Sequence, residues 1–209
     1  MLLLAGFFVI YMLVSLFYLL TALSFGSLIL EQLFSNRVFL ALWVSVASST
    51  VVALIALFFG IPASWVLAYK DFKAKPIIET LIVTIPIAFP PGVIGTTYLL
   101  MFSPSTSPIG AALSHLGINV VNTFWAIILV KTFISAPFLV SLLAEKFRNV
   151  RQTGLETIAK SLGASNFETF RTVTLPLSYK PIVAGTAMCW ARAIGEIAGT
   201  IVFAGAVIP

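Results

Sequence analysis

The sequence predicts an all-α, polytopic membrane protein, and three observations support this fold class. Of its 209 residues, 60% are hydrophobic and only 9% are charged, whereas soluble domains carry about 25% charged residues. Apolar runs recur that are long enough to cross a hydrocarbon core of about 30 Å as helices. The basic residues gather in two of the connections between these runs. We therefore expect residues 1–209 to form a single transmembrane domain.

Two long apolar runs open the chain. The run Leu2–Phe25 starts without charge and is longer than the apolar part of a cleaved signal peptide, about 7–15 residues, so it predicts a spanning helix. The run Val38–Tyr69 would measure about 48 Å as one helix, which is more than the membrane core requires. We expect Gly60 and Pro62 to bend this helix near its end, and the excess to project beyond the lipid.

The third run, Ile77–Phe102, is interrupted near its middle by Pro90, Pro91 and Gly92, with Pro86 shortly before them. Irregular backbone at this depth is tolerated only where protein or a water-filled cavity meets it. The pattern predicts a broken helix. It leaves open whether the break lines a path or only packs as a kink.

The fourth and fifth predicted spans are Thr123–Ala144 and Pro181–Val207. Two connections, Lys70–Pro76 and Glu145–Lys180, hold 9 of the 12 Lys and Arg residues, and the positive-inside rule places both in the cytoplasm. These residues suit anionic lipid head groups rather than nucleic acid. The N-terminus would then lie inside and Pro209 outside, in an apolar stretch. We therefore expect at least one further span that this sequence lacks.

The connection Glu145–Lys180 carries the signals of two short helices. Thr153–Glu156 has the spacing of a capping box, in which a hydroxyl and a carboxylate satisfy amides at a helix start. Gly163 supplies the left-handed residue that ends this first helix. Ser165–Glu168 repeats the capping spacing, and the second helix is expected to end just before Pro176. We call residues 155–177 the elbow.

Phe167 and Phe170 stand three residues apart and share one face of the second helix, while Glu168 and Arg171 occupy the neighbouring face. An amphipathic helix of this kind can lie on the membrane surface or insert into a groove of a partner protein. The residues alone leave both alternatives open.

The elbow sequence, LETIAKSLGASNFETFRTVTLPL, resembles the EAA loop of ABC importer permeases. That pattern reads Glu-Ala-Ala, three residues, Gly, nine residues, Ile, one residue, then Leu-Pro. Thr157 stands in place of the Glu, and Glu156 lies one position earlier, which is about 100° around a helix. The spacing is otherwise intact. The aligned positions are Thr157, Ile158, Ala159, Gly163, Val173, Leu175 and Pro176.

In such permeases this loop is the coupling helix, which docks into a cleft of a separate ATP-binding subunit and passes its motion to the spans. The resemblance implies that a partner supplies the ATPase. The chain itself shows no G-x-x-x-x-G-K-[ST] phosphate loop, so we expect a transport subunit rather than an enzyme. The positions assigned to ATPase coupling are Glu156, Ala159, Gly163, Ala164, Ser165, Phe167, Phe170 and Pro176.

A second segment bears on the class of substrate. Trp190–Gly205, WARAIGEIAGTIVFAG, is similar to a segment of molybdate, tungstate and sulfate permeases, in which Arg, Gly and Glu stand as Arg192, Gly195 and Glu196 do here. It departs from them at Ile197, where an aromatic residue is usual. The stretches IPIAFPPGVIG and SPIG also resemble this family. The resemblance implies that the transported substrate is an oxyanion, and it favours molybdate or tungstate over sulfate.

Arg192 and Glu196 are four residues apart, so we expect them to share one face of the fifth span, inside the bilayer. Ionisable residues at this depth face the protein interior or a cavity and usually pair. Either they border the anion path or they form a structural pair that fixes helix packing. Lys131 is expected to snorkel towards the outer surface, the alternative being a lining role. The candidate path or gate residues are Pro90, Pro91, Gly92, Arg192 and Glu196.

The combined expectation is the transmembrane domain of a type I ABC importer, a multi-pass protein of the plasma membrane. Two copies would pair around a path, two ATP-binding subunits would dock at the elbows, and an external substrate-binding protein would deliver the anion. Transport would follow alternating access, with no cofactor. The rivals are an importer of another solute such as phosphate or thiosulfate, a structural membrane scaffold, and an intramembrane enzyme. A single His and a single Cys disfavour the enzyme.

Overall fold

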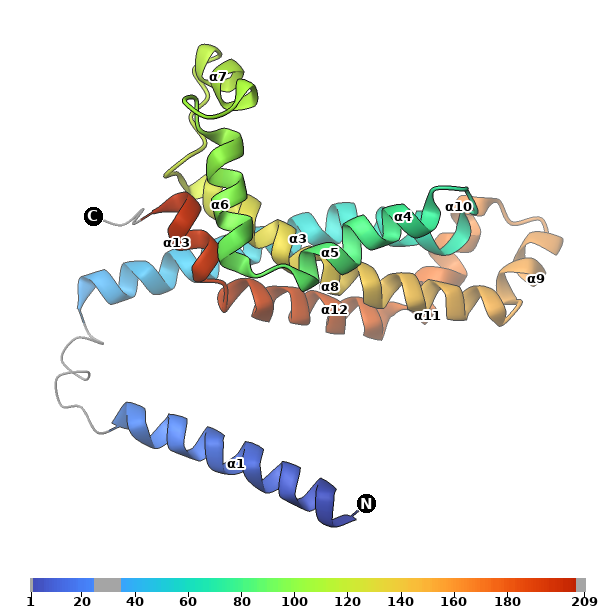
Figure 1. The fold of residues 1–209 in the computed structure, drawn as a ribbon. Helices are drawn as coiled ribbons and strands as arrows, with labels where there is room; N and C mark the ends of the chain where they lie inside the picture. The colour runs from blue at the N-terminus through green and yellow to red at the C-terminus, as the bar shows by residue number, and fades with distance from the viewer. Residues whose placement is uncertain (1, 25–34, 206–209) are drawn as a thin grey trace. The chain divides into compact units, whose positions relative to one another are not determined.

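Three helices among the described residues are long and apolar enough to span a membrane, and two further helix pairs are bent at a short break (Figure 1). The computed structural model describes residues 2–24 and 35–205, which divide into a unit up to Val44 and a unit from Ser45 onward. The first unit holds α1 (Leu2–Ser24), the first predicted helix. Its residues Leu3–Leu20 are all exposed. This helix therefore offers an apolar surface on every side, as a membrane span does.

α3 (Asn36–Tyr69) is one continuous helix of 34 residues that carries Pro62 inside it. A Cβ atom on Gly60 would lie 3.3 Å from the Val140 side chain of α8 (Phe124–Gln152), so the two helices approach closely. The Ser64 hydroxyl donates a hydrogen bond to the Val140 carbonyl at 3.1 Å. Small residues allow such close helix packing in membranes. Those on the buried face of α3 include Ala53, Ala56, Gly60, Ser64 and Ala68.

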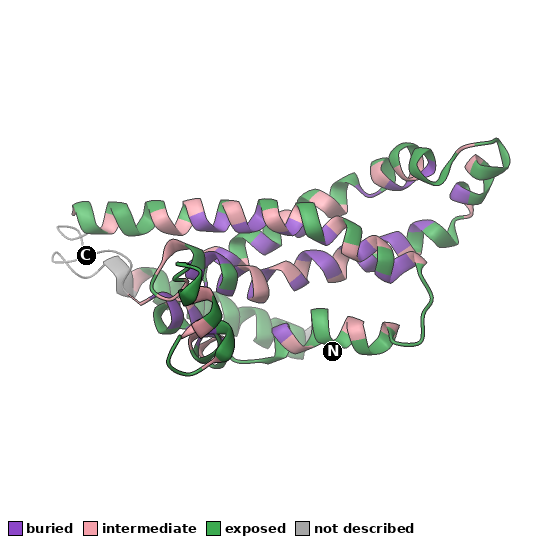
Figure 2. Ribbon diagram, turned by 90° about the horizontal axis from the view of Figure 1, so that it is seen from above, coloured by how far each residue is buried: buried purple, intermediate pink, exposed green. Residues whose placement is uncertain are grey.

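α8 is the central helix of the second unit, and buried positions recur along its whole length (Figure 2). The predicted fourth span ended at Ala144, but the helix continues to Gln152. No Gly or Pro stands between Ala144 and Gly154, so nothing ends it earlier. α8 packs against α3 and α12 (Tyr179–Ile194). The core cluster of these helices comprises Val52, Ala56, Ala68, Ile128, Leu139, Leu143, Phe147, Cys189 and Ala193.

The third predicted span is a pair of helical arms bent by 114° at the prolines. Pro90 is the extended residue ahead of the second arm, with ψ 132°. The break predicted at this point is therefore confirmed. The first arm consists of α4 (Lys75–Glu79), the π-helical turn η1 (Thr80–Thr84) and α5 (Ile85–Ala88), and the second arm is α6 (Pro91–Phe102).

The fifth predicted span, Pro181–Val207, is also broken, a break that the sequence analysis did not predict. α12 ends ahead of Glu196, and α13 (Ala198–Ala204) leaves it at an angle of 60°. The predicted end at Val207 lies outside the described residues. The Glu196 carboxylate accepts a hydrogen bond from the Gly199 amide at 2.8 Å. This side-chain bond replaces a backbone bond of the helix and stabilises the break.

α6 and α13 cross each other at glycines. A Cβ atom on Gly95 would lie 2.5 Å from the Gly199 carbonyl oxygen, and one on Gly199 would lie 2.8 Å from the Pro91 carbonyl oxygen. The two broken spans therefore touch backbone to backbone beside their breaks. Tyr98 of α6 packs on Phe203 of α13, with ring centroids 5.7 Å apart, and this contact supports the crossing.

Two π-helical turns each lead into a proline. η1 precedes Pro86, and η2 (Phe170–Thr174) precedes Pro176 in α11 (Leu175–Leu177). In each turn, the amide of the residue just before the proline bonds to a carbonyl five residues back. The wider turn accommodates the proline ring, and the helix continues. The prediction that the second elbow helix ends before Pro176 is therefore wrong.

The elbow has the predicted helix–turn–helix form, with α9 (Leu155–Ser161) and α10 (Asn166–Thr169). Gly163 between them has φ +94°, as predicted for a left-handed helix end. The second capping box is confirmed. The Ser165 amide donates to the Glu168 carboxylate at 2.7 Å, and the Glu168 amide donates to the Ser165 hydroxyl at 3.2 Å. The bond from the Ser165 amide holds the pKa of the Glu168 carboxyl below its ordinary value.

The first predicted capping box, Thr153–Glu156, is wrong. α9 begins after Gly154, which has φ +74°. The Thr153 hydroxyl accepts only a long hydrogen bond, 3.4 Å, from the Leu155 amide. The Glu156 carboxylate turns inward and bonds to the end of α3. The spacing fits a cap, but a contact distant in sequence takes the carboxylate.

The predicted outer loop, residues 103–122, contains a further helix, α7 (Pro108–His115). The Ser107 hydroxyl caps it by accepting a hydrogen bond from the Ile109 amide at 3.1 Å. A Cβ atom on Gly110 would lie 2.4 Å from the Ser103 carbonyl oxygen. Glycine at this position therefore lets α7 pack directly on the end of α6.

Candidate functional site

The elbow presents apolar side chains on its outside. Ile158 of α9 and Leu162, the residue after its end, are 57% and 84% exposed, and Phe167 of α10 is 71% exposed. Lys160 and Arg171 of the same segment are exposed as well. Apolar side chains gathered on a short helix pair, with basic neighbours, suit contact with a protein partner.

The positions assigned to coupling differ in exposure. Two of them build the turn of the elbow, because the Ala164 amide donates to the Ala159 carbonyl at 3.1 Å across Gly163. Gly163, Ser165, Phe167 and Pro176 are exposed, Ala159, Ala164 and Phe170 are partly buried, and Glu156 is buried.

Phe167 and Phe170 line one groove against α3, together with Ile61, Pro62 and Trp65, but they differ in burial. The Phe170 ring packs edge-on against Phe147 of α8, with ring centroids 6.2 Å apart. Phe170 therefore fixes the elbow to α8, and Phe167, which is 71% exposed, is the more accessible of the two to a partner.

The Glu156 carboxylate lies inside the chain, with the residue only 8% exposed. Its Oε1 accepts a hydrogen bond from the Tyr69 hydroxyl at 2.6 Å. The same oxygen accepts a hydrogen bond from the Thr174 hydroxyl. Tyr69 is the last residue of α3, and Thr174 is the last residue of η2. One carboxylate thus joins both arms of the elbow to the end of α3.

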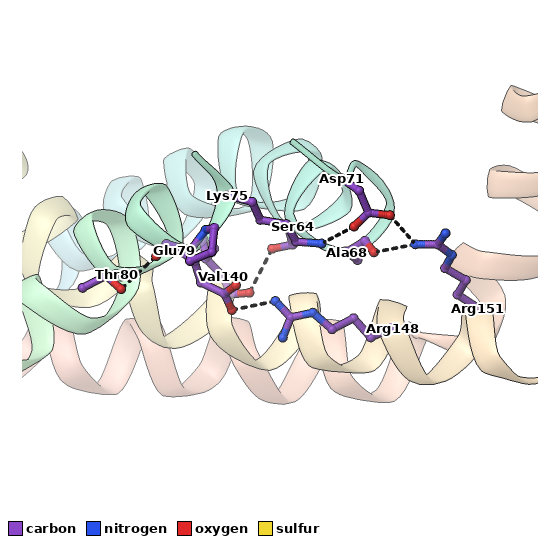
Figure 3. Close-up of polar contacts among 10 residues, drawn as sticks. Ser64, Ala68, Asp71, Lys75, Glu79, Thr80, Val140, Arg148 and Arg151 are labelled. Atoms are coloured by element: carbon purple, nitrogen blue, oxygen red, sulfur yellow. Dashed lines mark hydrogen bonds and ion pairs between the residues drawn. The ribbon is translucent and has the colours of Figure 1, made fainter. Parts of the chain in front are cut away.

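Charged pairs tie the connection after α3 and the start of the third span to the elbow end of α8 (Figure 3). Arg148 donates to Glu79 at 2.6 Å, and Arg151 lies 3.8 Å from Asp71. Lys75, which donates to Asp71 at 3.1 Å, holds the pKa of the Asp71 carboxyl below its ordinary value, and Arg151 adds to the effect. Part of the basic charge expected to face lipid head groups therefore pairs within the chain.

Arg192 and Glu196 form the predicted pair, with 2.9 Å between guanidinium and carboxylate. They do not lie on one helix face, because α12 ends between them and Glu196 occupies the break. The Glu196 side chain is 2% exposed and that of Arg192 is 30% exposed. Glu196 also accepts the Gly199 amide bond described above, so it holds both sides of the break.

Lys131 of α8 is 2% exposed, so the prediction that it snorkels outward is wrong. Its ammonium donates to the Ser48 hydroxyl at 2.9 Å and to the Ser49 hydroxyl at 3.2 Å, both on α3. Val130, the residue before Lys131, borders Gly199 together with the Glu196 carboxylate, since a Cβ atom on Gly199 would lie 2.9 Å and 3.3 Å from them. We call Lys131, Arg192 and Glu196 the charge cluster.

Sequence reasoning missed the partners of Lys131 because they lie 83 and 82 positions away along the chain. The available signal was a pair of adjacent serines, Ser48 and Ser49, inside an otherwise apolar run. Buried hydroxyls in a membrane helix need a partner, and an unpaired lysine elsewhere in the membrane is one.

The predicted path residues of the third span lie beside this cluster. The Pro91 carbonyl and the Glu196 carboxylate both border Gly199, since a Cβ atom there would lie 2.8 Å and 3.3 Å from them. Pro90 is exposed, and Pro91 and Gly92 are partly exposed. The structure thus brings the two breaks together, and the predicted one, at Pro90, reaches the surface of the chain.

Comparisons with known proteins agree with this arrangement. A family model described as binding-protein-dependent transport system inner membrane component matches residues 60–207. Over 160 residues the chain is 35% identical to the molybdate/tungstate transport system permease protein WtpB of Thermococcus kodakarensis, covering 77% of this chain and 58% of that protein.

Two further relatives carry related names. The chain is 34% identical over 205 residues to a probable molybdenum ABC transporter permease protein of Haloferax volcanii, covering 97% of this chain and 72% of that protein. It is 37% identical over 152 residues to a probable sulfate transport system permease protein, cysT, of Chlorokybus atmophyticus. This match covers 73% of this chain and 52% of that protein.

The chain matches 58% of the length of the Thermococcus relative, which is less than two thirds of that protein. The family model, in contrast, matches more than two thirds of this chain, from within α3 through α13. The matched part includes both breaks, the elbow and the charge cluster. The chain therefore belongs to the family of binding-protein-dependent transport system inner membrane components, the multi-pass permeases of ABC importers.

Proposed function

We propose that the chain is the permease subunit of an ATP-driven importer that carries an oxyanion, molybdate or tungstate, into the cell. The observation that carries this proposal is the elbow, which holds Ile158, Leu162 and Phe167 exposed at one end of the long helices. Such a patch needs a partner in water. An ATP-binding subunit that docks there supplies the energy, and a substrate-binding protein delivers the anion, as the family description implies.

The charge cluster supports an anionic substrate. The cluster holds two basic residues, Lys131 and Arg192, and one acidic residue, Glu196, which pairs with Arg192. A residual positive charge in a medium of low dielectric attracts an anion. The relatives named for molybdate, tungstate and molybdenum favour these ions. Sulfate is the second candidate because the Chlorokybus relative is named for it. Sulfate also has the same charge and tetrahedral shape as molybdate and tungstate.

The mechanism that we propose is alternating access by two copies of the chain with two ATP-binding subunits. α3 and α8 run from the elbow to the crossing of α6 and α13, which lies at the other end of α8 (Figure 1). ATP binding would draw the two elbows together, and these helices would carry the movement to the breaks. The path would then open outward to receive the anion, and hydrolysis would return it to the inward state.

Uptake by membrane vesicles tests the proposal. Vesicles hold the full-length permease, its ATP-binding subunit and the substrate-binding protein, and labelled molybdate, tungstate and sulfate are compared with and without ATP. We expect ATP-dependent uptake of molybdate and tungstate, and no uptake when the ATP-binding subunit lacks its phosphate-loop lysine. Uptake of sulfate alone would favour the second candidate. ATP-dependent uptake of none of these ions would overturn the oxyanion assignment.

A further inference from the structure

We infer that Glu156, together with Tyr69 and Thr174, is the joint through which movement of the elbow reaches α3. This inference rests on the proposed function, because it assumes that an ATP-binding subunit moves the elbow. We call these three residues the joint. Glu156 acts in it as a positioning residue.

The joint links three elements through one oxygen atom. Oε1 of Glu156, on α9, accepts hydrogen bonds from the hydroxyls of Tyr69 on α3 and Thr174 on η2. The Tyr69 hydroxyl also lies 3.3 Å from the Phe147 carbonyl of α8. Displacing α9 therefore pulls on both of its neighbours rather than bending the elbow alone.

The α3 side of the joint is held firmly. The Tyr69 ring stacks on Trp65 one turn earlier, with ring centroids 5.3 Å apart. The guanidinium of Arg151, from the end of α8, lies 5.9 Å from the centre of the same ring. Arg151 also donates to the Ala68 carbonyl at 3.3 Å. A pull on the Tyr69 hydroxyl is therefore passed to the end of α3 as a whole.

The joint also explains the departure from the EAA pattern. Thr157 stands at the position of the family's Glu, and it is exposed. Glu156, one residue earlier, is turned by about 100° to the inside. A carboxylate that accepts two hydroxyl donors in a buried place makes stronger bonds than a neutral group does. In this chain, therefore, the carboxylate binds the elbow to its own membrane helix.

Substitutions in the joint test this inference on the assembled transporter. Tyr69→Phe removes one hydroxyl, and Glu156→Leu removes the acceptor of both bonds. Glu156→Gln keeps an oxygen acceptor in the same place and is the conservative variant. Glu168→Gln is the matched control, because Glu168 is exposed on the same elbow and bonds only within it.

Molybdate uptake and ATP hydrolysis are measured together in vesicles that contain each complex. We expect Tyr69→Phe and Glu156→Leu to retain the ATP-binding subunit and to hydrolyse ATP, while the molybdate carried per ATP falls about fivefold. Glu156→Gln should keep most of the wild-type ratio, and Glu168→Gln should match it.

A distance measurement gives a second readout. Spin labels are placed at Phe58 of α3 and Ser161 of α9, both exposed and both outside the apolar docking patch, in a Cys189→Ala background. If the joint carries the elbow and α3 together, ATP leaves the distance between the labels unchanged. With Tyr69→Phe, ATP should change or broaden this distance.

Two results would overturn the inference. In one, Tyr69→Phe and Glu156→Leu transport at the wild-type ratio. In the other, both variants lose the ATP-binding subunit together with transport, as a role in folding alone predicts. Failure of the proposed function would look different, because the unsubstituted chain would then neither bind an ATP-binding subunit nor take up any oxyanion.

Discussion

Arg192 and Glu196 meet across the end of a helix, not along its face. Their sequence spacing predicted a pair, and the distance of 2.9 Å between their charged groups confirms the pair. Because the helix breaks between them, the two roles considered for this pair, fixing helix packing and bordering the anion path, are not exclusive. Glu196 accepts bonds from Arg192 and from the Gly199 amide, so a contact that fixes packing also fixes the break beside the predicted path.

Substitution of this pair separates packing from transport. Arg192→Ala leaves the buried Glu196 carboxylate with the Gly199 amide but without its guanidinium. Breaking a fully buried pair costs roughly 3–5 kcal/mol. We expect about 1–3 kcal/mol here, because Arg192 is 30% exposed. The measurement is thermal unfolding of the purified protein in detergent.

The double variant Arg192→Met with Glu196→Leu should recover most of this stability, because neither charge is then stranded. Recovered transport in the double variant would mean that the pair is structural. Recovered folding without transport would place the pair on the anion path. A double variant less stable than both single variants would contradict the pairing.

Among the elements, the elbow is the one whose form follows most directly from local sequence. Gly163 and the box of Ser165 and Glu168 were predicted because each depends on neighbouring residues only. The box of Thr153 and Glu156 failed because its carboxylate has partners on α3 and η2. No local pattern reports that competition.

Gly163→Val tests the elbow as a docking element. Its φ of +94° strains a β-branched residue by about 1–3 kcal/mol, although a Cβ atom there meets no described neighbour within 4 Å. The strain should tilt α10 and move Phe167 away from a partner. We expect normal amounts in the membrane, loss of co-purification with the ATP-binding subunit, and no uptake.

Gly117→Val is the control for this change. Gly117 also has a positive φ, +75°, and a Cβ atom there has no described neighbour within 4 Å, but it lies in the segment after α7. It should retain the ATP-binding subunit and uptake. If Gly163→Val keeps both as well, the elbow does not couple the chain to an ATPase.

The two broken spans show how far local sequence reaches. Pro90 and its neighbours predict the first break, because proline lacks a backbone amide donor and disfavours a helical conformation in the residue before it. The second break contains no proline. It is stabilised by the hydrogen bond from the Gly199 amide to the Glu196 carboxylate, which a sequence pattern does not predict. The π-helical turns before Pro86 and Pro176 were missed for a related reason, since a proline alone does not tell whether the helix ends or widens.

At the scale of the whole molecule, contacts between helices that are distant in sequence determine which polar side chains pair, and the sequence does not reveal these pairs. The partners of Lys131 come from α3, and those of Glu156 come from α3 and η2. Apolar runs show where the chain can cross a membrane but not which helix faces meet, because the runs are apolar on nearly every side. The orientation in the membrane, in contrast, rests on the distribution of basic residues alone.

Labelling of introduced cysteines tests this orientation. Lys73→Cys and Asn149→Cys both lie at exposed positions of the two basic segments, and Asn149 lies on the part of α8 that extends past the predicted span. In a Cys189→Ala background, both should react with impermeant thiol reagents only from the cytoplasmic side. Ser105→Cys, exposed before α7, should react only from outside. Labelling of Lys73→Cys from outside intact cells would reverse the topology.

The glycine contact between α6 and α13 restricts how these two helices can move past each other. A shift of α13 by one residue would bring Ala198 or Thr200 to the place of Gly199, where a Cβ atom lies 2.8 Å from the Pro91 carbonyl oxygen. Sliding along the helix axis is therefore blocked by steric overlap. Rotation about the contact keeps glycine against glycine and meets no such barrier. The glycine contact therefore favours rotation of α6 and α13 about Gly95 and Gly199 over sliding of one helix along the other.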